Sequence, residues 1–175
     1  MNKHLQLVRE FREKFDFPAP DDHISDMHIV LRQAWLMEAG KEVLLAIKQG
    51  DMSEILTRLT GLVYLALNAI AQRGCECEVS EPTVFWRHDG TVLSLMRMIS
   101  ERINACSSGL CKDYSELYCV TAQVASSFLN ADFDKAFITF HQHQLEKGGD
   151  YRHDAECQGE IDWSNLPDMS ACLYE

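Results

Sequence analysis

The stretch Ile55-Leu-Thr-Arg-Leu-Thr-Gly-Leu-Val-Tyr-Leu-Ala-Leu-Asn-Ala-Ile70 decides the fold of this chain. As a helix it would be apolar on nearly all sides, so the pattern predicts a helix in the middle of a bundle. Asp51 and Glu54 stand just before it at the spacing of a capping box. In that motif Asp51 would accept the first free N–H groups, and Glu54 would reach back. We therefore expect a central helix that begins just after Asp51.

Other segments with helical spacing of apolar residues surround this stretch. They cover residues 3–16, about 22–49, about 92–106, about 113–130 and about 132–147. Residues 74–91 contain glycine, proline and cysteine and are expected to form a loop. No segment alternates in the manner of a strand. The sequence predicts an all-α bundle of about six helices in one domain, 1–149. We expect residues 150–175 to form an acidic, irregular tail that is either packed on the body or partly mobile.

One internal similarity is visible. Asp51-Met-Ser-Glu-Ile-Leu56 resembles Asp113-Tyr-Ser-Glu-Leu-Tyr118, and Leu67-Asn-Ala69 returns at the same separation as Leu129-Asn-Ala131. Helix capping alone explains Asp and Glu at this spacing. The other interpretation is a duplicated helix–turn–helix unit that gives a four-helix core.

Composition limits the classes of partner. Hydrophobic residues make up 46% of the chain and charged residues 25%, as in soluble globular proteins. The net charge of −11 argues against a nucleic-acid backbone or an anionic membrane as the main partner, though not against nucleotides. We see no signal peptide and no apolar run of about 18 residues. The cytoplasm is therefore expected, with the seven cysteines reduced.

Two carboxylates, Glu38 and Glu42, lie one helical turn apart and share a helix face. Such a pair can hold Mg²⁺, which usually serves phosphate groups. The alternative is a solvated helix face, because Lys41 and Lys48 are nearby in the sequence. Spacing alone leaves both interpretations open.

The order of residues between 32 and 74 resembles the MazG-like all-α nucleotide pyrophosphohydrolases, including their phosphoribosyl-ATP pyrophosphohydrolase-like branch. The residues that carry the likeness are Arg32, Leu36, Glu38, Glu42, Ala46-Ile47, Gly50-Asp51, Glu54-Ile55 and Leu62-Val63-Tyr64. Two outer segments add to it. Val8–Phe15 followed by Pro18 looks like the opening helix of that branch. Phe133–Phe137 with His141 and Lys147 looks like its closing helix, whose usual His-x-Ser-Asn-Met-x-Lys motif reads His-Gln-His-Gln-Leu-Glu-Lys here. Residues 75–131 would be an insertion or a second repeat.

The resemblance implies a MazG-like bundle that hydrolyses nucleoside triphosphates to monophosphate and pyrophosphate with Mg²⁺ or Mn²⁺, and that forms a homodimer. In that family the metal is held by Glu-Glu-x-x-Glu on one helix and Glu-x-x-Asp on the next. Glu38 and Glu42 match the first motif and would be metal ligands. Arg58, His141 and Lys147 would contact the substrate.

Three of the five acidic positions differ from the family pattern. The middle glutamate of the first motif is Ala39, and the second motif has Arg58 and Gly61 in its acidic positions. If Arg58 points into the same cleft, its guanidinium would pair with Glu38 or Glu42 and stand where the metal would stand. Glu101 would complete the site if the two halves of the chain pack face to face.

Two hypotheses about function follow. The first is a metal-dependent nucleotide pyrophosphohydrolase with a rearranged acidic site. The second is a non-catalytic MazG-like relative that binds a nucleotide or a protein partner. The degenerate second motif favours the non-catalytic relative, and the usual activity of the family favours the hydrolase.

Overall fold

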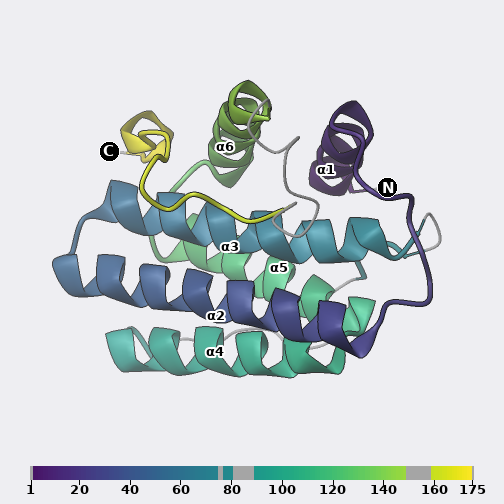
Figure 1. The fold of residues 1–175 in the computed structure, drawn as a ribbon. Helices are drawn as coiled ribbons and strands as arrows, with labels where there is room; N and C mark the ends of the chain where they lie inside the picture. Colours follow the sequence, from purple (N-terminus) through teal and green to yellow (C-terminus); the bar gives the residue numbers. More distant parts are fainter. Residues whose placement is uncertain (1, 75–76, 81–88, 149–158, 175) are drawn as a thin grey trace.

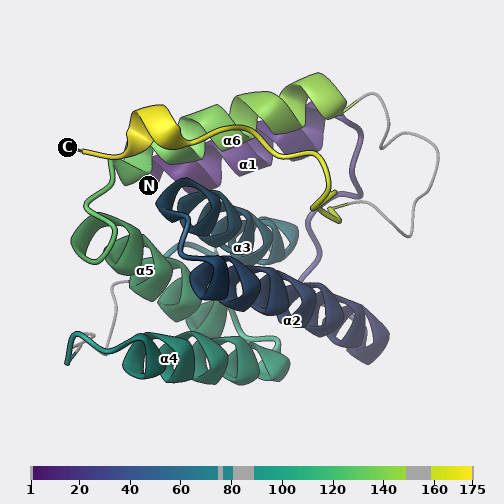
Figure 2. The ribbon, with the colours of Figure 1, turned by 90° about the vertical axis from the view of Figure 1, so that its left-hand side faces the viewer.

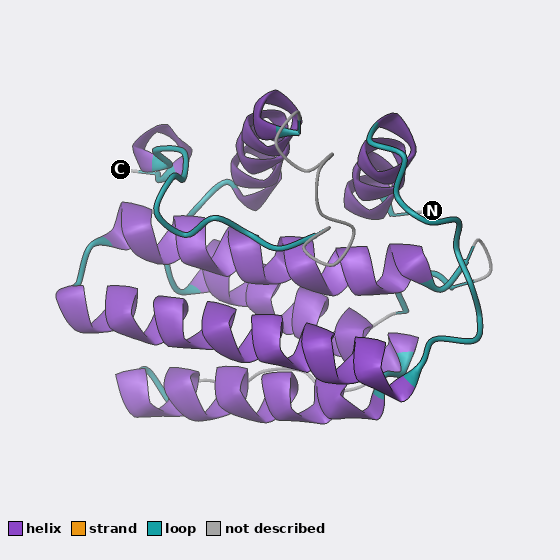
Figure 3. Ribbon diagram, in the orientation of Figure 1, coloured by secondary structure: helices purple, strands orange, loops and turns teal. Residues whose placement is uncertain are grey.

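The computed structural model describes residues 2–74, 77–80, 89–148 and 159–174. These ranges hold six α-helices and two 3-10 turns, and the only β-type pairing within them is one isolated bridge between Ala131 and Leu173 (Figure 3). The all-α, six-helix prediction is therefore confirmed. The helices are α1 (Lys3–Lys14), α2 (Asp26–Gln49), α3 (Met52–Gln72), α4 (Val92–Ala105), α5 (Cys111–Ser127) and α6 (Phe133–Lys147).

Helix α3 is the centre of the molecule. It packs against α2, α5, α1 and α6, while α4 closes the bundle against α2 and α5. The helices α2 to α5 form the core, and α1 and α6 lie side by side across α3 (Figures 1 and 2). The chain after Gly159 follows the surface of α3 (Figure 1).

The position of α3 explains its composition. Sixteen of its residues are buried, including Thr60 and Asn68, so the helix is surrounded rather than amphipathic. By length and composition it could cross a membrane, but 89% of its apolar window is buried inside the bundle. This is the pattern of the core helix of a soluble protein.

The expected capping box is only half present. Asp51 accepts hydrogen bonds from the backbone N–H groups of Ser53 and Glu54, at 2.9 and 3.2 Å. Glu54 does not reach back, because its carboxylate binds Arg58 one turn further along the helix. The capping interpretation of the internal similarity is wrong at Asp113. Helix α5 begins at Cys111 without a side-chain cap, and Asp113 accepts a hydrogen bond from the hydroxyl of Ser108.

A disulfide joins Cys77 to Cys111, whose Cα atoms are 6.5 Å apart. It links the chain that follows α3 to the first residue of α5. The expectation that every cysteine is reduced is therefore wrong for this pair. Cys106, Cys119 and Cys172 are free.

We expect reductant to lower the stability of the protein. The bridge spans 34 residues, and releasing a loop of that size costs about 3–4 kcal/mol in the chain-entropy model. The measurement is the midpoint of thermal unfolding with and without dithiothreitol. Cys77→Ser is the control, since its midpoint should be low already and insensitive to reductant. Equal midpoints for the native protein in both conditions would contradict the prediction.

His4 fixes α1 to the rest of the bundle. Its ring is almost fully buried and stacks on Phe137 with centroids 4.1 Å apart. Nδ1 lies 3.0 Å from the hydroxyl of Tyr118, and Nε2 lies 3.0 Å from Oδ1 of Asp134. Burial lowers the pKa of His4 to about 4, and the nearby Asp134 offsets only part of that shift. The folded protein therefore holds this imidazole neutral.

We expect the free energy of unfolding to fall between pH 6.5 and about pH 4. The unfolded chain protonates His4 more readily than the folded chain does. The contribution of His4 to the free energy of unfolding is therefore complete above pH 6.5 and is lost as the pH decreases toward 4. The loss should be about 3 kcal/mol, at 1.36 kcal/mol for each pH unit between the two pKa values. Urea denaturation across this range measures it. His4→Phe should flatten the slope; an unchanged slope would assign the pH dependence to other groups.

Candidate functional site

The guanidinium of Arg58 is the centre of the candidate site. Nη1 donates to Oε2 of Glu42 at 3.1 Å and to the backbone oxygen of Trp163 at 2.9 Å. Nε and Nη2 both donate to Oε2 of Glu54, at 3.2 and 3.1 Å. The sequence left the partner of Arg58 open between Glu38 and Glu42, and the structure shows the pair with Glu42. The side chains of Arg58 and Glu42 are 18% and 19% exposed, so both are largely withdrawn from water.

This arrangement uses Glu42, the carboxylate of α2 that pairs with Arg58. A positive guanidinium bound to Glu42 repels a divalent cation and occupies the oxygen that the cation would need. A metal site between two helices would need a carboxylate at this point, and Arg58 instead places a positive charge where α2 and α3 face each other.

The C-terminal segment, which we define as residues 159–174, covers the same surface of α3. It runs antiparallel to the helix. Gly159 lies beside Asn68, Trp163 beside Gly61, and the Asp168 carboxylate 3.1 Å from the hydroxyl of Ser53. Two backbone contacts hold the end of the segment. The N–H of Asp132 donates to the oxygen of Cys172 at 2.8 Å, and Ala131 forms the isolated bridge with Leu173. The acidic tail expected for 150–175 is thus packed on the body over these described residues.

Trp163 packs directly on Gly61 of α3. A Cβ atom built on Gly61 would lie 2.8 and 2.9 Å from two carbons of the Trp163 ring. No larger residue fits at position 61 unless the ring moves. The guanidinium carbon of Arg58 lies 5.9 Å from the centre of the same ring, within the range of a cation–π contact. The two departures from the second motif, Arg58 and Gly61, therefore both serve the docking of Trp163.

Lys147 also binds the C-terminal segment. Its Nζ donates to the backbone oxygen of Asn165 at 2.7 Å and lies 3.3 Å from Oδ2 of Asp162. Hydrogen bonds from Ser164 hold the pKa of Asp162 below its ordinary value, and Lys147 adds to this shift. The ammonium group expected to contact a substrate phosphate thus has two partners within the protein.

His141 is part of the core. Its Nδ1 lies 3.1 Å from the hydroxyl of Tyr64, and its ring packs edge-on against Phe11. Burial lowers its pKa, so the ring stays neutral near pH 7. Among the interactions the structure gives it, His141 holds α6 against α3 and α1.

The remaining acidic candidates do not converge. Glu38 and Glu101 are exposed, on α2 and α4 respectively. Within the described ranges no three His, Cys, Asp or Glu side chains lie close enough to hold a metal ion together. Glu42 is shared between Arg58 and Lys41, the latter at 3.4 Å.

The sequence interpretation missed the C-terminal segment as part of the site. One signal was available, namely the glycine at position 61 in an otherwise bulky helix. A residue without a side chain on an otherwise bulky helix leaves room for a close neighbour. It did not indicate which part of the chain fills that room.

Comparison of the chain with protein-family models found no match, and comparisons with curated proteins and with solved structures found none either. What the site can do is therefore argued from its own geometry. Arg58, Lys147 and Gly61 hold the C-terminal segment against the bundle, so this surface is covered by the chain itself.

Proposed function

We propose that this protein is a non-catalytic MazG-like relative that binds a nucleotide without hydrolysing it. The observation that supports the proposal is the ion pair between Arg58 and Glu42 at 3.1 Å, in the place that the family reserves for a metal. A divalent cation would have to displace a guanidinium that makes hydrogen bonds to two carboxylates and one backbone oxygen. Metal-dependent hydrolysis at Glu38 and Glu42 is correspondingly disfavoured.

The docking of the C-terminal segment supports the same proposal. Trp163 lies over Gly61, and Lys147 is bound to Asn165 and Asp162. A triphosphate that approached this surface of α3 would meet the segment before it met Glu42. We therefore place nucleotide binding elsewhere on the bundle. Buried positive charge is available there from Arg12 on α1 and Arg32 on α2.

The experiment has two parts. Pyrophosphate release is measured with a panel of nucleoside triphosphates in Mg²⁺ and in Mn²⁺, and we expect none above the rate without protein. Thermal unfolding is then followed with the same nucleotides in the presence of EDTA, where a ligand of the folded state raises the midpoint. Metal-dependent pyrophosphate release that disappears in Glu42→Gln would overturn the proposal in favour of the hydrolase.

The homodimer implied by the resemblance stays a prediction. Light scattering coupled to size-exclusion chromatography checks it, with an expected mass of about twice the 20.0 kDa of one chain.

A further inference from the structure

The helices hold the C-terminal segment by its backbone oxygens. Three positively charged side chains each donate a hydrogen bond to one of these oxygens: Arg58 to Trp163, Lys147 to Asn165 and Lys135 to Ala171. We call the part of α3 and α6 that carries these donors the segment-binding surface. Because every residue of a peptide has a backbone oxygen, such contacts recognise a peptide more than its particular side chains.

The segment is shaped by contacts within itself. Its sequence repeats one unit, Asp–apolar–Ser, at Asp162-Trp-Ser164 and at Asp168-Met-Ser170. In both units the carboxylate accepts the N–H of the serine, at 3.0 Å in the first and 2.9 Å in the second, and it also accepts the serine hydroxyl. These are Asx turns, which need no residue outside the unit. The same peptide from another copy of the chain would therefore have the same local shape, which lowers the cost of binding it.

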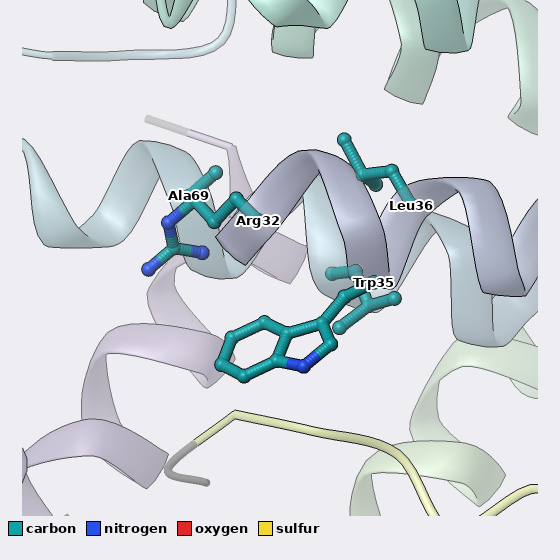
Figure 4. Close-up of a pocket in the computed structure, with 5 residues that line it drawn as sticks. Arg32, Trp35, Leu36 and Ala69 are labelled. Atoms are coloured by element: carbon teal, nitrogen blue, oxygen red, sulfur yellow. The ribbon is translucent and has the colours of Figure 1, made fainter. Parts of the chain in front are cut away.

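The middle residue of each unit packs on the helices. Trp163 lies over Gly61, and Met169 is fully buried. The start of the segment is held from α2. Figure 4 shows the indole of Trp35 extending toward it, and a Cβ atom built on Gly159 would lie 3.7 Å from that ring. Recognition is thus spread along the segment, from its first residue to Met169.

Charge also matches across this contact. The charged residues within 159–174 are all acidic: Glu160, Asp162 and Asp168. Arg58 already pairs with carboxylates of α2 and α3, so Lys135 and Lys147 carry the attraction, and Lys147 lies 3.3 Å from the Asp162 carboxylate. The net charge of −11 opposes the approach of two copies, so their pairing requires a local match of opposite charge. The segment-binding surface provides that match for this segment.

The connection after α6 is what assigns the segment to its own chain. The six helices pack on one another around α3 without it, and residues 149–158 join it to α6. A stretch of that length reaches about 33–36 Å when fully extended, or about three helix diameters. This reach is enough for the segment of one copy to lie on a copy packed alongside.

We propose that the C-terminal segment of one copy binds the segment-binding surface of a second copy, so that the protein forms a dimer with exchanged segments. The contacts of the segment are then the same as within one chain, and such an exchange is a low-cost route to a dimer. Protein concentration sets the balance between the two forms, relative to the effective concentration of the segment within its own chain. This inference does not depend on nucleotide binding.

Disulfide trapping between two different variants tests the exchange. Ala131 and Leu173 form the isolated bridge, with flanking hydrogen bonds donated by Asp132 and Tyr174. The Cα atoms of such a pair are about 4.5 Å apart, which suits a disulfide. One chain carries Ala131→Cys and the other Leu173→Cys, and both carry Cys172→Ser to remove the adjacent native thiol. The two chains are mixed in equal amounts in urea, refolded together and oxidised.

We expect a linked pair of twice 20.0 kDa on a non-reducing gel, because exchange brings position 173 of one chain to position 131 of the other. Refolding at a tenfold higher concentration should raise the ratio of linked pair to monomer about tenfold while the monomer predominates. Neither variant alone should give the pair. The double variant Ala131→Cys, Leu173→Cys in one chain is the positive control, since it should close its own bridge at high dilution.

If the double variant closes its bridge and the mixture stays monomeric, the exchange is overturned. A dimer in light scattering without the linked pair also overturns the exchange, while the predicted homodimer stands. Neither result bears on nucleotide binding, which has its own experiment.

A labelled peptide with the sequence 159–174 carries the test if the double variant does not close. Fluorescence anisotropy should show that it binds the Met169→Ala chain, whose own segment is weakened, about 10- to 100-fold more tightly than the native chain. The Asn165→Ala chain should behave like the native one, and circular dichroism checks that each chain is folded. Equal binding to all three chains, or binding to none, overturns the proposal.

Discussion

The triple variant Arg58→Glu, Gly61→Asp, Trp163→Ala is expected to bind Mn²⁺, whereas the native protein is not. The substitutions place two carboxylates on α3 opposite Glu42 and remove the ring that stands 2.8 Å from the Cβ position of residue 61. Carboxylate oxygens on facing helices are the ligands that such a cation needs. At a Mn²⁺ concentration of 100 times the dissociation constant, the folded state should gain about 2.7 kcal/mol.

Thermal unfolding with and without Mn²⁺ measures this gain as a higher midpoint. Two controls isolate its cause. The double variant that retains Trp163 should respond less, because the new aspartate meets the ring. Adding Glu42→Gln to the triple variant should remove the response. If the triple variant is folded and its midpoint is the same with and without Mn²⁺, α2 and α3 do not form a metal site even when acidic residues are introduced.

Met169→Ala should produce the second large effect, a loss of stability of about 2–5 kcal/mol. Met169 is 0% exposed, although it belongs to an irregular segment, and truncating a buried methionine costs this amount in a close-packed core. Denaturant unfolding measures the global loss. Hydrogen exchange at Tyr174, whose N–H donates to the oxygen of Asn130 at 3.0 Å, measures the release of the segment.

Asn165→Ala is the matched control for this prediction. Its side chain is exposed in the same segment, so the substitution should change stability by less than about 0.5 kcal/mol. If Met169→Ala behaves like Asn165→Ala in both measurements, the C-terminal segment does not contribute to the core in solution.

The helices could be predicted because their signals are local. The apolar stretch from Ile55 to Ile70 gave α3, and Asp51 and Gly50 gave the boundary between α2 and α3, which the structure places at Gln49 and Met52. The pairing of Arg58 with a glutamate of α2 could also be expected from the sequence, and the structure shows Glu42 as the partner. Two antiparallel helices joined by a short turn bring such positions opposite each other, and opposite charges then pair.

The rest of the site could not be predicted, for a physical reason. The C-terminal segment is held largely through backbone oxygens, such as those of Trp163 and Asn165, and every residue type carries one. Its buried anchors, Ile161, Met169 and Cys172, follow no period. Nothing in the sequence around Arg12 and Arg32 indicates that α1 and α2 turn both side chains toward Asn68 and Gln72 of α3.

The antiparallel course of the C-terminal segment along α3 has a kinetic consequence. The contact of Ser53 with Asp168 joins positions 115 residues apart, and that of Arg58 with Trp163 joins positions 105 apart. Helical bundles usually fold fast because their contacts are local, whereas distant contacts require large loops to close. During synthesis α3 leaves the ribosome long before its cover exists. One side of α3 therefore stays exposed until the C-terminal segment is synthesised. In this partly folded state, chaperone binding or self-association would compete with folding.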